Sequence, residues 1–217
     1  MIPARGGSTR VEGKNLRKFA GRPLIHWSIR NALVAGFSPT VVTDSGAISK
    51  EARTMGAAVL KEPPELAKGN TPLAEVARFF FQQRGSQHHI IYLQPTSPLM
   101  DYRTIYRAVE LHALGKFDSV YSGWPARFVL RDRDGEVVNH PLIKGANGGL
   151  PWSKDWAPQW VQDSAVYVLD RLRLPVMSYV IGGRVGVVET DPLRWIDIDT
   201  EEDWQRGERL ARCLGLA

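Results

Sequence analysis

Cysteine is almost absent from this sequence. Its 217 residues include a single cysteine, Cys213. One cysteine cannot form an internal disulfide and cannot build a metal site from cysteine ligands, so we expect Cys213 to be a packing residue of the last helix. The chain is 43% hydrophobic, which is enough to bury a full core. We therefore predict one main domain that is stabilised by packing.

Long apolar segments are missing as well. No run of about 18 apolar residues occurs that could span a membrane, and the beginning lacks the apolar stretch of a secretory signal. We therefore expect a cytoplasmic protein without membrane contact. Only Met1 and Ile2 precede a loop rich in glycine, so a strand before this loop is either very short or clipped.

Blocks of like charge are the third absence. The net charge is +5, which favours anionic partners in general. However, no block of five or six like charges occurs, and no basic helix carries interleaved aromatic residues. We therefore expect no nucleic-acid partner. The positive charge is densest beside the glycines near the beginning of the chain.

Strand and helix patterns alternate four times along the first half of the chain. Apolar stripes predict helices over 23–34, 45–56, 72–84 and 102–114, and β-branched runs predict strands over 39–45, 57–62, 88–94 and 117–123. We expect Thr71 and Asp101 to cap the third and fourth helices. This alternation predicts an α/β fold with a mostly parallel twisted sheet, flanking helices, and a ligand site at the carboxyl ends of the strands.

The pattern changes after Trp124. The segment RDRDGEVV (131–138) is typical of a hairpin, residues 144–158 are rich in glycine, proline and tryptophan, and SAVYVLD (164–170) predicts a strand. We interpret residues 125–190 as a small β-rich excursion, for substrate specificity or subunit contact, within a single domain over 1–217. RWIDID (194–199) predicts a last strand, and Thr200 with Asp203 predicts a capping box for the last helix.

The segment IPARGGSTRVEGKN, residues 2–15, combines glycine with positive charge. Its glycines allow positive φ angles and let backbone N–H groups approach an anion closely. Its cations supply formal charge, and one opposite-charge pair at 4 Å contributes about 4 kcal/mol before desolvation. Neither the P-loop nor the dinucleotide fingerprint is present. We predict a triphosphate cradle, with a flexible solvated turn as the alternative. The residues concerned are Gly6, Gly7, Gly13, Arg5, Arg10 and Lys14.

Two carboxylates, Asp197 and Asp199, alternate at the end of the last predicted strand. Residues i and i+2 of a strand point to the same side, so both carboxylates can face one point. Mg²⁺ that also binds phosphate oxygens needs one or two such ligands. We predict a magnesium site here, and the alternative is a solvated strand end.

The connection LQPTSPLM, residues 93–100, follows a buried predicted strand and precedes a helix. Two prolines stiffen it, and Gln94, Thr96 and Ser97 offer donors and acceptors on the stiff backbone. These residues suit substrate recognition. A turn that is merely stiffened by proline is equally compatible with the pattern.

Together, IPARGGSTRVEGKN, AGRPLIHWSI, LQPTSPL, SAVYV and IDIDTEEDW closely resemble the acylneuraminate cytidylyltransferases, or CMP-sialic acid synthetases, over almost the whole chain. The resemblance implies a nucleotidyltransferase fold (Rossmann-like, GT-A-like), use of CTP and Mg²⁺, transfer of CMP to an acidic nine-carbon sugar with release of pyrophosphate, and a homodimer. By position, it assigns Ala4, Arg5, Ser8, Lys14 and Asn15 to the nucleotide loop, Gln94 to the sugar turn, and Asp197 and Asp199 to the metal.

The sequence departs from the family pattern on both sides of the expected site. On the nucleotide side, Thr9 stands where lysine is usual, Glu12 where proline is usual, and Glu62 and Gly69 where the family has arginine and aspartate. Arg10 is a candidate to replace the missing lysine charge.

On the acceptor side, Asp163 and Ser164 replace asparagine and glycine before Tyr167, a further candidate for the acceptor pocket. An aspartate repels a carboxylated sugar unless it is paired, which leaves open an acceptor other than N-acetylneuraminate.

The implied chemistry is attack of a sugar hydroxyl on the α-phosphorus of CTP, with Arg5, Lys14 and Asp199 as the catalytic candidates. Their roles would be alignment and charge stabilisation, since phosphoryl-type transfer needs little covalent help. Two alternatives remain open: activation of a different acid, such as Kdo, another nonulosonate or a phosphonate, and a nucleotide-binding homologue without catalysis.

Overall fold

The computed structural model describes residues 1–8, 10–68, 71–85, 88–139, 159–172 and 180–216. Among these residues no helix has both the length and the apolar character needed to cross a membrane. The helices are α1 (Leu24–Val34), α2 (Gly46–Thr54), α3 (Leu73–Gln83), α4 (Tyr102–Ala113), the 3-10 helix η4 (Pro192–Arg194) and α5 (Glu201–Cys213). The strands are β1 (Ile2–Pro3), β2 (Lys18–Phe19), β3 (Arg22–Pro23), β4 (Thr40–Thr43), β5 (Ala58–Lys61), β6 (His89–Leu93), β7 (Ser119–Ala126), β8 (Gln159–Asp170) and β9 (Val185–Glu189).

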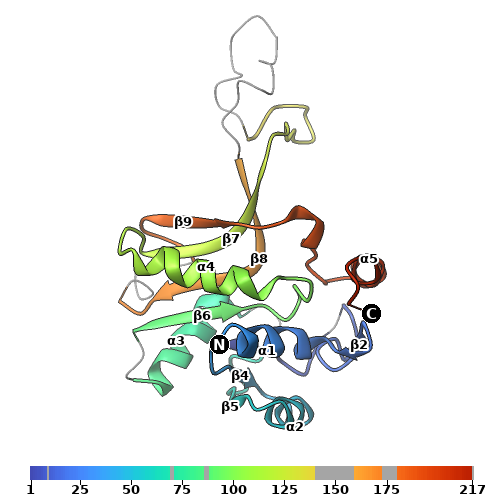
Figure 1. The fold of residues 1–217 in the computed structure, drawn as a ribbon, viewed down its shortest axis with the longest axis vertical. Helices are drawn as coiled ribbons and strands as arrows, with labels where there is room; N and C mark the ends of the chain where they lie inside the picture. Colours follow the sequence, from blue (N-terminus) through green and yellow to red (C-terminus); the bar gives the residue numbers. More distant parts are fainter. Residues whose placement is uncertain (9, 69–70, 86–87, 140–158, 173–179, 217) are drawn as a thin grey trace, which may run out of the picture.

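Two sheets form the centre of the fold (Figure 1). The first has the order β1-β4-β5 and is parallel throughout. The second has the order β6-β8-β7-β9, with β8 antiparallel to both neighbours and β9 parallel to β7. The Leu93 N–H donates to the Met1 carbonyl at 3.0 Å and so joins β6 to the beginning of β1. The α/β fold class is therefore confirmed, with one mixed sheet beside the parallel one.

The long strands β7 and β8 define the excursion. They pair from Ser119 with Leu169 to Ala126 with Gln159, and their outer ends rise from the body as an arm (Figure 1). The hairpin expected over residues 131–138 is a turn with one bridge, between Arg131 and Val137. The glycine- and tryptophan-rich segment 144–158 lies outside the described residues.

Two of the three predicted helix caps are present in the structure. Asp101 caps α4 by accepting a hydrogen bond from the Arg103 N–H, and Thr200 and Asp203 form the expected capping box of α5. The cap predicted for α3 is wrong. Pro72, not Thr71, occupies the cap position with φ −60° and ψ 141°, and no side chain caps this helix. The extended Pro72 backbone starts the helix one residue later than the sequence suggested.

The prediction of a last strand over residues 194–199 is also wrong. After η4 this segment is extended but unpaired, and the Ile198 N–H donates instead to the Thr96 carbonyl at 2.9 Å. Its alternating pattern has another cause, because Ile196 and Ile198 are buried in a core cluster without a sheet partner. Asp197 and Asp199 are left on the opposite side of the same extended segment.

Three strands were not predicted from the sequence: the two-residue strands β2 and β3, and β9, VGVVE, at the edge beside β7. β9 contains Gly186, and glycine is depleted in strands. Here the glycine is required by a close approach, since a Cβ at this position would lie 2.8 Å from the Phe117 ring.

The packing of helix α5 holds the segment that carries Asp197 and Asp199 in place. Trp204 and Ala211 of α5 pack with Phe19, Ile196 and Ile198 in one buried cluster. The extended segment before α5 is therefore held between this helix and the core.

Candidate active site

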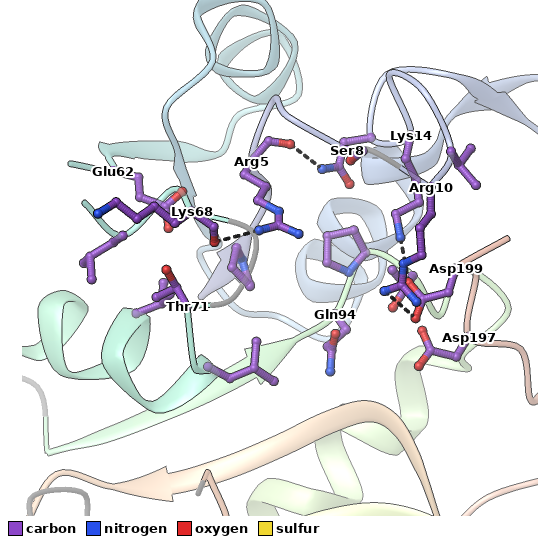
Figure 2. Close-up of a pocket in the computed structure, with 18 residues that line it drawn as sticks. Arg5, Ser8, Arg10, Lys14, Glu62, Lys68, Thr71, Gln94, Asp197 and Asp199 are labelled. Carbon is purple, nitrogen blue, oxygen red and sulfur yellow. Dashed lines mark hydrogen bonds and ion pairs between the residues drawn. The ribbon is translucent and has the colours of Figure 1, made fainter. Parts of the chain in front are cut away.

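A cavity of about 290 Å³ lies where the first sheet meets β6 (Figure 2). Arg5 follows β1, Glu62 follows β5 and Gln94 follows β6, so the carboxyl ends of three strands supply its lining. Asp197 and Asp199 enter from the segment before α5.

Most of the residues singled out in the sequence line this cavity. They are Arg5, Ser8, Arg10, Lys14, Asn15, Gln94, Thr96, Asp197 and Asp199. Seven others do not line it: Ala4, Gly6, Gly7, Gly13, Ser97, Asp163 and Tyr167. Thr9 and Gly69 lie outside the described residues.

The cationic loop and the acidic pair meet directly. Lys14 Nζ lies 3.0 Å from Asp199 Oδ1 and donates to the Ile198 carbonyl at 2.7 Å. Arg10 Nη2 lies 3.0 Å from Asp199 Oδ2. Two segments from opposite ends of the chain thus share one wall of the cavity (Figure 2).

The Asp197 carboxyl is more enclosed than an ordinary surface aspartate. Burial raises its pKa above the usual value, the nearby Thr96 hydroxyl opposes this rise, Asp199 adds to it, and Lys14 opposes it. The protein thus brings together two carboxylates whose negative charge it balances with two cations, Lys14 and Arg10.

This donor set suits magnesium. Among the described residues no group of three or more His, Cys, Asp or Glu side chains could hold a metal ion. Mg²⁺ at Asp197 and Asp199 would therefore depend on phosphate oxygens and water for its other positions, which is its usual mode beside a bound nucleotide. Lys14 and Arg10, which both pair with Asp199, supply positive charge beside this position, where a bound triphosphate would need it.

The glycine-rich loop is anchored at several points. The Gly6 N–H donates to Asp44 Oδ1 at 2.8 Å, and a Cβ on Gly6 would lie 3.0 Å from Ser45 Cβ. Asn15, which is buried, donates from Nδ2 to the Arg5 carbonyl at 3.0 Å. The Gly6 N–H, which the sequence suggested for a phosphate, is thus used by a side chain in this structure.

The connection after β6 is held by backbone contacts. The Gln94 N–H donates to the Ala165 carbonyl at 3.2 Å, and the Ser28 hydroxyl donates to the Gln94 carbonyl. The Gln94 side chain lies at the middle of the cavity (Figure 2). Ser97 instead lines a second cavity of about 150 Å³, next to Asp163.

The comparisons with known proteins agree with this arrangement. The family model described as "Cytidylyltransferase" matches residues 1–171. The chain belongs to the cytidylyltransferase family. N-acylneuraminate cytidylyltransferase A of Danio rerio is 30% identical over an alignment of 220 residues, which covers 99% of this chain and 51% of that protein. CMP-N,N'-diacetyllegionaminic acid synthase of Legionella pneumophila is 39% identical over 231 residues, 97% of this chain and 94% of that protein.

A solved structure shares the fold of this cytidylyltransferase. CMP:2-keto-3-deoxy-manno-octonic acid synthetase, complexed with CTP, superimposes with a TM-score of 0.71 at 16% identity, covering 98% of this chain and 97% of that one. The chain spans about half the length of the curated N-acylneuraminate cytidylyltransferases of fish that it matches.

Asp163 is one of the positions at which this cytidylyltransferase departs from the family pattern. It is 5% exposed and accepts hydrogen bonds from the Ser122 hydroxyl, the Ala165 N–H at 3.0 Å and the Thr190 hydroxyl at 2.8 Å. These three partners satisfy the Asp163 carboxyl by hydrogen bonds, and none of the three is a cation. Tyr167 lies nearby in β8 and accepts a hydrogen bond from Gln162 Nε2 at 2.8 Å.

Glu62 is another departure. The resemblance put it on the nucleotide side of the expected site, and no role was predicted for it. It lines the cavity although it is only 4% exposed. The pKa of its carboxyl is raised from 4.5 to about 7, mainly by burial; Asp44 contributes to the rise, and Arg5 opposes it. The signal in the sequence was its place at the end of a predicted strand, as for Gln94.

Proposed function

We propose that this cytidylyltransferase transfers CMP from CTP to an acidic sugar, a nonulosonate such as a sialic or legionaminic acid, and releases pyrophosphate. The observation that carries the proposal is the meeting of Lys14 and Arg10 with Asp199 in one cavity. A nucleoside triphosphate with its metal requires this combination of cations and carboxylates. The relatives are named for N-acylneuraminate, diacetyllegionaminate and 2-keto-3-deoxy-manno-octonate, and their names support the acceptor class.

The residues of the chain act by alignment and charge. Arg5, Arg10 and Lys14 bind the triphosphate, and Lys14 stabilises the charge that develops on the leaving pyrophosphate. A sugar hydroxyl attacks the α-phosphorus, the bond from that phosphorus to the bridging oxygen breaks, and pyrophosphate departs. The hydroxyl proton passes to solvent or to a base within the site.

Asp197 and Asp199 would hold Mg²⁺, which supplies Lewis-acid charge at the phosphate oxygens when bound. When CTP binds, Lys14 and Arg10 turn from the Asp199 carboxylate to the phosphates of the nucleotide. The ion pairs with Asp199 keep both cations close to the place where the phosphates would bind.

The acceptor belongs beside Gln94 and Thr96, which give the cavity a polar edge next to the aspartates. Ser97, Asp163 and Tyr167 lie behind this edge, and we assign them to shaping the acceptor site from the second cavity and from β8.

We also propose a homodimer in which the arm of the excursion forms the contact. The support is a set of large apolar side chains that the arm exposes: Phe128, Leu130, Val138 and Trp160. Apolar side chains gathered on one projecting segment are typical of a subunit interface. Sedimentation velocity should give twice the monomer mass, and a Leu130→Glu variant should shift the protein to monomer. A wild-type protein that sediments as a monomer would exclude this dimer.

The decisive experiment incubates the protein with CTP, Mg²⁺ and one acidic sugar at a time: N-acetylneuraminate, N,N'-diacetyllegionaminate and 3-deoxy-manno-octulosonate. Pyrophosphate release and the mass of the CMP-sugar are measured. We expect turnover with one of the nine-carbon acids. Turnover with the eight-carbon acid alone would move the assignment to Kdo, and CTP binding without any turnover would replace the enzyme by a nucleotide-binding homologue.

A further inference from the structure

The cavity has two chemically different ends (Figure 2). Arg10, Lys14 and the aspartates lie at one end, with Gln94 between the ends. The other end holds Glu62 together with polar and aliphatic neighbours. These neighbours are Lys68, Thr71, Leu66, Leu73 and Val76, and Arg5 lies between the two ends (Figure 2).

The shape of a nucleotide decides which part belongs at which end. The triphosphate belongs beside Arg10 and Lys14, where the cations and the metal ligands are. The nucleoside is then left for the Glu62 end. Leu66, Leu73 and Val76 offer apolar surface to the flat faces of a base, and polar groups nearby can pair with its edge.

Glu62 is the acidic residue that lines this end of the cavity, and it is 4% exposed. Its backbone is fixed, because its N–H donates to the Thr43 carbonyl at 2.9 Å as a continuation of the β4–β5 pairing. Its carboxyl takes part in no hydrogen bond and in no ion pair within 4 Å among the residues that the structure describes. Arg5, whose charge acts on Glu62, donates to the Lys68 carbonyl at 2.8 Å instead. A buried carboxyl without a partner is costly unless it is neutral or receives one from a ligand.

We propose that Glu62 recognises the edge of the cytosine base as a neutral acid, its O–H donating to N3 and its carbonyl accepting from the 4-amino group. This inference rests on the proposed function for the identity of the nucleotide. In the neutral form both bonds are satisfied at once. An ionised carboxylate would instead place a lone pair of electrons against that of N3.

The charges around Glu62 favour this neutral form near neutral pH. Burial raises the pKa of Glu62 to about 7; Asp44, beyond the end of β4, raises it further, and Arg5, beyond β1, lowers it. Tyr92 of β6 is the other titratable group that interacts with Glu62, and burial keeps its pKa well above 10, so it stays neutral. The acid therefore loses its proton within the range in which enzymes are assayed.

The test is the affinity for CTP, measured by calorimetry between pH 6 and pH 8.5 on the wild type and on Glu62→Gln. The amide keeps one donor and one acceptor but does not titrate. If only neutral Glu62 binds, the wild-type Kd should rise about thirtyfold relative to that of Glu62→Gln over this range. The ratio is used because the terminal phosphate of CTP also titrates near neutral pH. Glu65→Gln, an exposed change in the same segment, should follow the wild type.

A second nucleotide separates the base from the phosphates. 3-Deazacytidine triphosphate presents a C–H in place of N3, so its affinity for the wild type should lose the pH dependence that Glu62 causes. Parallel pH profiles for wild type and Glu62→Gln, or an unchanged wild-type profile with the deaza nucleotide, would overturn the proposal.

These binding measurements use no acceptor. Failure of every acidic sugar to react would therefore reject the proposed function and leave the Glu62 result standing. Conversely, a protein that makes a CMP-sugar but shows parallel profiles would keep its function and lose the role of Glu62.

Discussion

Lys14 and Asp199 lie 185 positions apart in the chain, yet their charged groups meet at 3.0 Å. Lys14 also donates to the Ile198 carbonyl, so one ammonium group holds both the backbone and the carboxylate of this segment. The loop that begins the chain and the segment that precedes its last helix thus form a single charged wall. The carboxylates before α5 thus account for the position of the loop cations, and the cations account for the position of the carboxylates.

Replacing Lys14 by alanine should separate catalysis from stability. Pyrophosphate release should fall about 100-fold, the usual cost of removing one group that stabilises transition-state charge. The free energy of unfolding should fall by only about 1 to 2 kcal/mol, because the Ile198 carbonyl loses its donor while Asp199 keeps Arg10 as a partner. Turnover and urea unfolding are measured on the same preparation.

Lys18→Ala is the matched control for this change, since Lys18 is exposed on β2 and does not line the cavity. It should leave turnover unchanged. Near-normal turnover of Lys14→Ala, or an equal loss in both variants, would contradict the role of the loop.

Asp197→Asn should weaken the response to magnesium. The amide keeps the size of the side chain but removes the charge that a hard cation requires. The Mg²⁺ concentration for half-maximal turnover should rise roughly tenfold or more, by analogy with the cost of disturbing a metal site. Titration of pyrophosphate release with Mg²⁺ at saturating CTP measures it.

The exposed Glu202→Gln, five residues further on in the first turn of α5, removes the same charge outside the cavity. Its magnesium titration should match that of the wild type. If Asp197→Asn also matched the wild type, the acidic pair would have no part in metal binding.

The elements that the sequence predicted well are those with local causes. The helices α1, α2 and α4 follow from apolar stripes within their own segments, and Ser45 and Asp101 also cap α2 and α4. The residue types of the loop and of the aspartate pair also pointed to their shared cavity, because glycine with cations and paired carboxylates are unusual combinations.

What the sequence did not reveal depends on packing. The alternation at Ile196 and Ile198 predicted a strand, but their partner is a core cluster and not a neighbouring strand. β9 was not predicted because it contains Gly186, and only the position of the Phe117 ring explains why a glycine stands there. The importance of Glu62 came from its burial, which no local pattern encodes.

The packing of α5 gives a prediction about stability. A Cβ on Gly207 would lie 2.8 Å from Cε2 of Phe19, whose ring is fully buried and cannot move aside. Gly207→Ala should lower the free energy of unfolding by about 1 to 2 kcal/mol, since overpacking outweighs the gain in helix propensity. Gly46→Ala in α2 meets nothing within 4 Å and should raise it by about 0.5 kcal/mol. If both variants shifted the free energy of unfolding in the same direction, the packing argument would be contradicted.

Glu62 makes the stability of the unliganded protein depend on pH. Its pKa is raised from 4.5 to about 7 on folding, so between these values the folded state keeps a proton that the unfolded state has lost. Stability must therefore fall as pH rises through this window and then level off. At about 1.4 kcal/mol per pKa unit, the full loss is roughly 3 kcal/mol.

Glu62→Gln removes this titration, because the amide is neutral at every pH. Relative to the wild type, the variant should gain roughly 3 kcal/mol of unfolding free energy between pH 4.5 and pH 8.5. Any constant effect of the amide cancels in this comparison, which urea unfolding without nucleotide can measure. Glu65→Gln should show no such gain, since Glu65 is exposed. An equal difference from wild type at both pH values would mean that the Glu62 carboxyl titrates normally, and its recognition of the base as a neutral acid would then fail with it.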